Sequence, residues 1–208
     1  SMEQLDLSNF NTSQVVNMQN MFLNCVNLVK LDVENFDTGQ VTNMHDMFHD
    51  CKSLKELDLN NWNTDNVTDM RYMFQGCQSL TELSLEKFNT KQVTYMASMF
   101  IGCDSLKTIY VSEYNSETSE GWSTSSITNS VSMFLHCTNL VGGNGTIYDA
   151  SHVDATYARI DTADTPGYFT NVKDKVKEYI IQINIKNIEK TIDKGENKVY
   201  NNIRYKKK

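Results

Sequence analysis

The sequence repeats itself at intervals of 26 residues. Cysteine recurs at this interval in four units and leucine or isoleucine in five, at Cys25, Cys51, Cys77 and Cys103 and at Leu5, Leu31, Leu57, Leu83 and Ile109. A fixed period of roughly 20–50 residues is typical of architectures in which similar units stack on one another. The period therefore constrains the fold more strongly than any local propensity does.

One complete unit runs from Leu54 to Cys77 as L-x-x-L-x-L-x-x-W-x-T-x-x-V-x-x-M-x-x-M-F-x-x-C. The aromatic slot of successive units holds Phe10, Phe36, Trp62 and Phe88, and the next slots hold Thr, Val, Met and a Met-Phe pair. Past Val111 the pattern is offset by eight residues, with Trp122, Thr124, Ile127, Met133, Phe134 and Cys137 in the slots of the fifth unit. The fifth unit therefore carries an insertion near residues 113–121.

The periodicity changes within each unit. Apolar and polar residues alternate in the L-x-L stretch, which predicts a short half-buried strand. The apolar residues from Val67 to Cys77 are spaced by three and four, which predicts a helix of about three turns. A threonine such as Thr38 or Thr64 precedes this run in the position of an N-cap. We therefore expect an α/β solenoid with parallel strands on its concave side and short helices on its convex side.

The strings LDLSNFNTSQVVNMQNMFLNCVNL and LDLNNWNTDNVTDMRYMFQGCQSL resemble leucine-rich repeats, and more closely the BspA-like, DUF285-type repeats of bacterial surface proteins. The resemblance covers roughly residues 3–140, and residues 141–170 are similar to the segment that closes such arrays. Phe or Trp stands in the slot where leucine-rich repeats usually carry a capping asparagine, so we expect an aromatic spine there. The resemblance implies an exported bacterial protein that attaches to host proteins or to other cells.

The charge divides the chain after residue 170. Residues 1–170 hold 8 basic and 21 acidic residues, a formal charge of −13, whereas residues 171–208 hold 11 and 5, a formal charge of +6. Alternation over 178–188, a turn at 194–197 and apolar residues over 199–205 suggest a hairpin. We therefore expect three parts: a solenoid over 3–140, a cap over 141–170, and a basic extension over 171–208 that is a hairpin or a linker to a further domain.

The cysteines and methionines fit a core better than a site. Their even spacing, the odd number of five cysteines and the absence of a C-x-x-C pair favour buried, reduced thiols over a disulfide framework or a zinc site. His45, Asp46, His49 and Asp50 place two histidines four residues apart, a spacing that suits a shared metal ion on a helix. No third ligand is apparent, so solvated surface residues are the better interpretation, and we expect neither metal nor cofactor.

The sequence contains no defensible nucleophile–base pair, phosphate-binding glycine loop or pair of acid/base carboxylates, which argues against an enzyme. It has no apolar run long enough to span a membrane. What remains is the strip of residues that flank the buried leucines of each strand, here called the acidic strip: Asp6, Ser8, Asp32, Glu34, Asp58, Asn60, Ser84, Glu86 and Tyr110. We expect this strip to bind a basic or polar protein rather than nucleic acid. The alternative is a recognition or scaffold module attached to a separate effector or enzymatic domain.

Overall fold

The computed structural model describes the backbone of residues 4–193 and the side chains of 5–189. Its elements are β1 (Gln4–Leu5), β2 (Lys30–Leu31), β3 (Glu82–Leu85), β4 (Thr108–Val111), the 3₁₀ helix η1 (Ala155–Tyr157), β5 (Phe169–Asn171) and α1 (Val172–Asp193). The chain divides into two compact units, Ser1–Val172 and Lys173–Lys208. Each unit is described by itself.

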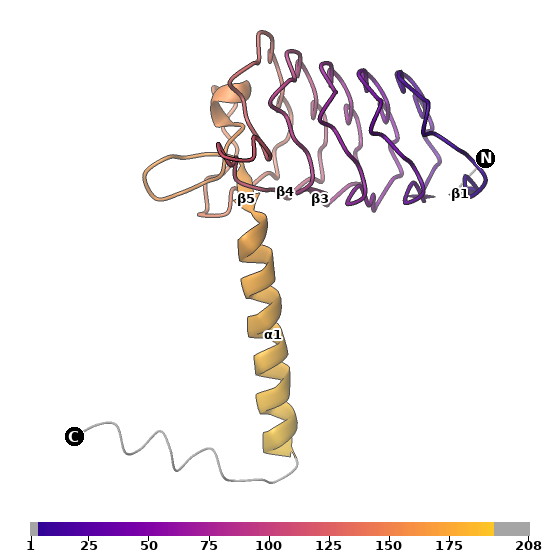
Figure 1. The fold of residues 1–208 in the computed structure, drawn as a ribbon. Helices are drawn as coiled ribbons and strands as arrows, with labels where there is room; N and C mark the ends of the chain where they lie inside the picture. The colour runs from indigo at the N-terminus through magenta and orange to yellow at the C-terminus, as the bar shows by residue number, and fades with distance from the viewer. Residues whose placement is uncertain (1–3, 194–208) are drawn as a thin grey trace. The chain divides into compact units, whose positions relative to one another are not determined.

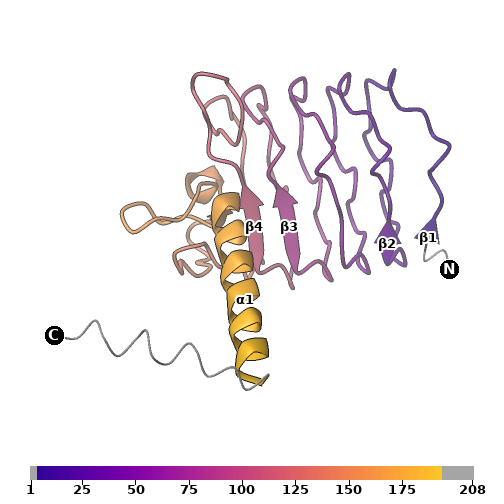
Figure 2. The same cartoon turned by 60° about the horizontal axis from the view of Figure 1, so that its bottom comes forward.

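In the first unit, successive 26-residue segments form similar turns of backbone that lie side by side (Figure 1). β1 pairs with β2 in parallel, with Leu5 beside Leu31, and β3 pairs with β4 in parallel, with Leu83 beside Ile109. Figure 2 shows the arrows of β3 and β4 pointing the same way. Further parallel bridges join residues at equivalent positions in five successive segments: Asn17 to Asn43, Asn43 to Asp69, Asp69 to Tyr95, and Tyr95 to Asn129. Residues one period apart are therefore neighbours in space.

The expected helix over Val67–Cys77 and its counterparts is not present; each run is a series of turns. Two residues of every run, four apart, have positive φ: 58° at Tyr72 and 68° at Gly76, for example. An α-helix cannot contain such residues, because left-handed backbone breaks the right-handed spiral. Alternate backbone N–H groups instead donate to the next segment, as from Phe74 to Met99 and from Gly76 to Ile101. The apolar residues spaced by three and four are thus the buried residues of successive turns, and not one face of a helix.

The phenylalanines of the Met-Phe pairs form one continuous stack through the core. Consecutive ring centroids lie 5.5–5.7 Å apart and the rings are within 8° of parallel, in the order Phe22, Phe48, Phe74, Phe100 and Phe134. The sequence predicts a second aromatic spine, in the slot that holds Phe10, Phe36, Trp62 and Phe88. This spine is shorter than expected. Phe36 stacks on Trp62 with ring centroids 6.5 Å apart, but Phe10 is 55% exposed.

The repeated threonines link neighbouring segments and do not act as helix caps. The Thr64 hydroxyl donates to the backbone carbonyl of Asn89, 3.0 Å away, and accepts from the backbone N–H of the same residue at 2.8 Å. Thr38 makes the same pair of bonds with Asn63, and Thr90 makes it with Ser123. A hydroxyl can serve as donor and acceptor at once, which is why a threonine suits this buried corner.

Residues 141–171 pack against the last segment. β5 pairs in parallel with β4, and the rings of Tyr168 and Phe169 contact Phe134 edge to face, with centroids 5.2 and 5.8 Å away. The buried carboxylate of Asp161 ties this region together, because it accepts hydrogen bonds from the backbone of Asn144, Thr146 and Gly167 and from the Thr146 hydroxyl. This end of the Phe stack is therefore covered.

The second unit contains most of α1, so the strand expected over 178–188 is wrong. The apolar residues there also fit helical spacing, as Ile181, Ile185 and Ile188 are four and three residues apart, and a short apolar pattern does not separate the two periods. The turn over 194–197 and the strand over 199–205 lie outside the described residues. Over the part of the chain that is described, no helix combines the length and the apolar character needed to cross a membrane.

Candidate functional site

Six of the nine residues of the acidic strip are exposed: Asp6, Ser8, Asp32, Glu34, Asp58 and Asn60. Because Leu5 pairs with Leu31, the adjacent Asp6 and Asp32 occupy equivalent positions on neighbouring strands. Ser84 and Glu86 are half-buried. The strip thus presents its acidic residues mainly in the first three segments, as the sequence predicts.

Tyr110 corrects the predicted strip, because its side chain is only 7% exposed. It lies in β4 between Ser84 of β3 and Thr170 of β5. The strand β5 was not foreseen, and Thr170, its residue opposite Tyr110, is buried as well. The open part of the strip therefore ends before β4.

The aspartates of the strip also shape the backbone. The side chain of Asp32 accepts a hydrogen bond from the backbone N–H of Glu34 at 3.1 Å, and Asp58 accepts one from Asn60 at 2.9 Å. Such Asx turns are a common way for aspartate to end a strand. Asp6 makes the same bond to Ser8, which lowers the pKa of Asp6 below its usual value. Replacing these carboxylates with other side chains therefore alters the turn as well as the charge.

The strip contains a hollow of about 200 Å³ lined by Lys30, Leu31, Asp32, Val33, Glu34, Glu56 and Asp58. Four of the lining residues are acidic and one is basic. The structure therefore brings Asp32, Glu34 and Asp58 together, and it adds Glu56, which the sequence did not single out. An array of carboxylates around a shallow hollow favours a cationic group on a partner.

A larger cleft, of about 670 Å³, lies beside the strip and shares Asn60 and Glu86 with it. Its other walls are the corners at 61–65 and 87–89 and the inserted segment at 112–121. The insertion forms a small hairpin, in which Asn115 pairs with Glu120 in antiparallel fashion. The sequence located this insertion by its break in the 26-residue period, but it did not show that the hairpin would wall a cleft.

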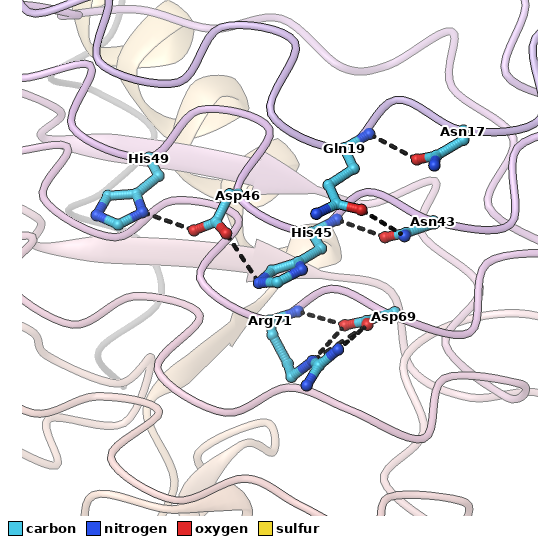
Figure 3. A network of polar contacts seen from close by, with 8 residues as sticks. All are labelled: Asn17, Gln19, Asn43, His45, Asp46, His49, Asp69 and Arg71. Atoms are coloured by element: carbon cyan, nitrogen blue, oxygen red, sulfur yellow. Dashed lines mark hydrogen bonds and ion pairs between the residues drawn. The ribbon is translucent and has the colours of Figure 1, made fainter.

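The histidine cluster is bound together by Asp46, which lies between the two imidazole rings (Figure 3). Its carboxylate oxygens lie 2.8 Å from Nε2 of His45 and 2.6 Å from Nδ1 of His49. Nearby, the guanidinium of Arg71 binds both carboxylate oxygens of Asp69. Among the described residues, no three His, Cys, Asp or Glu side chains are arranged to hold a metal ion. The histidine cluster is thus a set of polar contacts within one segment, beside a separate ion pair between Asp69 and Arg71 in the next segment.

The comparisons with known proteins give a family and no relative of known activity. A family model described as Mycoplasma protein of unknown function, DUF285, matches residues 1–114 and again residues 55–168. Neither the curated proteins nor the solved structures contain a match. The two matched ranges together span 1–168, which includes all five repeats and most of the segment that covers them. This chain therefore belongs to the DUF285 family.

Proposed function

We propose that this chain is a non-catalytic protein-binding module of the BspA-like leucine-rich-repeat type, displayed at the surface of a bacterium, where it attaches the cell to host or bacterial surface proteins. The parallel pairing of equivalent slots one period apart supports the solenoid class. Membership of the DUF285 family is compatible with this type. A solenoid presents its repeated surface to a partner as one continuous strip.

The acidic strip is the observation that carries the proposal. Its exposed aspartates recur in register, and Asp32, Glu34 and Asp58 surround one hollow. The acidic charge of residues 1–170 extends the same sign over the whole repeat region. Complementary charge steers association and selects partners, so the strip fits a protein with a basic surface.

The experiment measures binding of the fluorescently labelled chain to cultured epithelial cells and to bacterial cells. The variant D32N/E34Q/D58N removes three charges but keeps a side-chain oxygen for each Asx turn. The control D104N/E117Q/D164N removes three exposed charges away from the strip. We expect saturable binding that falls about tenfold in the strip variant, weakens as salt is raised and persists in the control.

Two results would count against this function. Equal binding by the strip variant and the wild type would show that the partner docks elsewhere. An absence of saturable binding to either kind of cell would remove the attachment role altogether.

The second candidate, a recognition module attached to a separate effector, has one observation in its favour. The apolar side chains along α1 are exposed, with Val176 at 56%, Tyr179 at 69% and Ile181 at 55%. A helix with so much exposed apolar surface is suited to pack against another domain or chain. Light scattering on the purified chain and on the variant I181K/I185K would show whether α1 mediates such association.

A further inference from the structure

The insertion in the fifth segment builds a rigid wall for the cleft described above. The amide nitrogen of Asn89 donates to the carboxylate of Asp65 at 2.8 Å and to the carbonyl of Ser119 at 3.0 Å, so it joins the hairpin to the third segment. The backbone of Trp122 donates to Ser112 at 3.1 Å and closes the base of the hairpin. These bonds hold the hairpin in place before any ligand arrives.

Gly121 lies at the base of the hairpin, and its backbone conformation leaves no room for a larger residue. Its φ is 101°, and a Cβ at this position would lie 2.6 Å from the carbonyl oxygen of Glu113. Only glycine adopts this backbone without strain. A fixed wall lowers the entropic cost of binding, because the site need not be ordered by its ligand.

The lining of the cleft offers two kinds of polar group. Carboxylates come from Asp65, Glu86, Glu113 and Glu120, against the single amine of Lys87, which lies 3.9 Å from Glu86. Amides come from five asparagines that line the cleft: Asn60, Asn61, Asn63, Asn89 and Asn115. The lining therefore combines an excess of negative charge with groups that pair well with peptide bonds.

Among these amides, Asn63 and Asn115 have donors to spare. The side-chain oxygen of Asn63 accepts from the backbone of Asp65, and that of Asn115 accepts from the backbone of Glu117. Their amide nitrogens make no hydrogen bond within the described part of the chain. Each nitrogen can therefore donate to a carbonyl group of a ligand.

We infer that this cleft, walled by the inserted hairpin, is the specificity pocket of the acidic strip and binds an extended basic segment of a protein partner. The inference rests on the proposed function and names its ligand. Lysine or arginine side chains pair with the carboxylates, and the asparagine amides pair with the backbone of the segment. A volume of about 670 Å³ has room for several residues and lies within the usual range of ligand pockets. Because Asn60 and Glu86 belong to both surfaces, one partner segment can follow the strip into the cleft.

The test uses fluorescence anisotropy with a labelled ten-residue peptide of alternating lysine and serine, and a matched peptide in which every lysine is acetylated. The variant E113Q/E120Q neutralises the hairpin wall of the cleft. The matched control is E117Q, because Glu117 lies on the same hairpin but does not line the cleft. Thermal melts followed by circular dichroism establish that all three proteins remain folded.

We expect the lysine peptide to bind, the acetylated peptide not to bind, and E113Q/E120Q to weaken binding about fivefold. E117Q should change the affinity by less than about twofold. An equal loss in E117Q would reduce the effect to general charge and overturn the inference, as would unchanged binding in E113Q/E120Q. Competition by a neutral oligosaccharide such as chitotetraose would assign the cleft to glycans and overturn it too.

The same series separates this inference from the function on which it rests. If D32N/E34Q/D58N loses cell binding while E113Q/E120Q binds like wild type, the acidic strip is the binding surface and the cleft is not part of it. In the other case, the wild type binds the peptide tightly in the cleft but fails to bind cells. That result would support the cleft as a peptide-binding pocket and contradict the attachment role.

Discussion

The thiol of Cys77 donates a hydrogen bond to the backbone carbonyl of Phe48, 3.3 Å away in the preceding segment. Cys51, Cys103 and Cys137 bond in the same way to Phe22, Phe74 and Phe100. All five cysteines are free thiols, and all but Cys25 are buried. The cysteine slot therefore links adjacent segments as well as filling the core.

Thiol labelling should distinguish Cys25 from the other four. Burial raises the pKa of Cys51 and of Cys137 to about 12, and it also raises the pKa of Cys77 and Cys103. Only the thiolate reacts with Ellman's reagent. At pH 8 we expect one thiol per chain to react in the native protein and five in denaturant. Several fast thiols in the native protein would contradict the buried positions.

Replacing Phe74 with alanine should destabilise the repeat region by about 3–5 kcal/mol, because the substitution opens a cavity in the middle of the Phe stack. Urea unfolding followed by circular dichroism measures the loss. Phe10→Ala is the matched control, since its ring is 55% exposed, and it should cost less than about 1 kcal/mol. Similar losses for the two variants would mean that the stack does not carry the core.

Thr64→Val keeps the shape of the side chain and removes the hydroxyl that bonds twice to Asn89. Leaving the part-buried N–H and carbonyl of Asn89 unpaired should cost about 2 kcal/mol. Thr64→Ser keeps the hydroxyl and should recover most of that loss. Chemical denaturation of the three proteins provides the comparison, and equal stability of the valine variant would show that the threonine bonds contribute little.

Asp161 should contribute stability that depends on pH. Burial raises the pKa of this carboxyl, but the hydrogen bonds from Thr146, Asn144 and Gly167 outweigh burial and hold the pKa below its usual value of 3.8. A lowered folded pKa means that the stabilisation is complete above pH about 4 and is lost as the pH falls through the folded pKa. We expect Asp161→Asn to be less stable at pH 7, with a difference from wild type that shrinks below pH 4. A constant difference from pH 7 to pH 3 would contradict this linkage.

The repeat and the inward slots were predictable because a period of 26 residues leaves few ways to bury the same apolar positions in every unit. Leu57, Met73 and Cys77 are buried, as their slots predict. The helix expected over Val67–Cys77 was wrong because spacing alone does not decide the structure: turns and a helix can both present residues three and four apart. A signal was present in the residues with positive φ, which are often Asn, Asp, Ser or Gly, as at Asn20, Asp46, Ser98 and Gly102.

The candidate site was predictable only in part. Asp32, Glu34 and Asp58 were found because strand alternation decides which side chains face outward. Tyr110 was misplaced because β5 comes from residues 169–171, which share no period with the repeats. The cleft depends on how an eight-residue insertion folds back on two earlier segments. A contact of that kind, as between Asn89 and Ser119, leaves no periodic mark in a sequence.

Within each Met-rich run, the backbone hydrogen bonds between segments change direction at the first methionine: the residue two positions before it, such as Thr42, donates to the preceding segment, and residues from the methionine onward donate to the following one. In each run the N–H groups at alternate positions donate to the following segment, as from Met18 to Asn43 and from Phe22 to Met47. From the first methionine of a run to the residue before its cysteine, each segment thus offers N–H groups to the segment that follows and carbonyls to the segment that precedes it. The two sides of a segment are therefore chemically different over this stretch, which gives the array a direction.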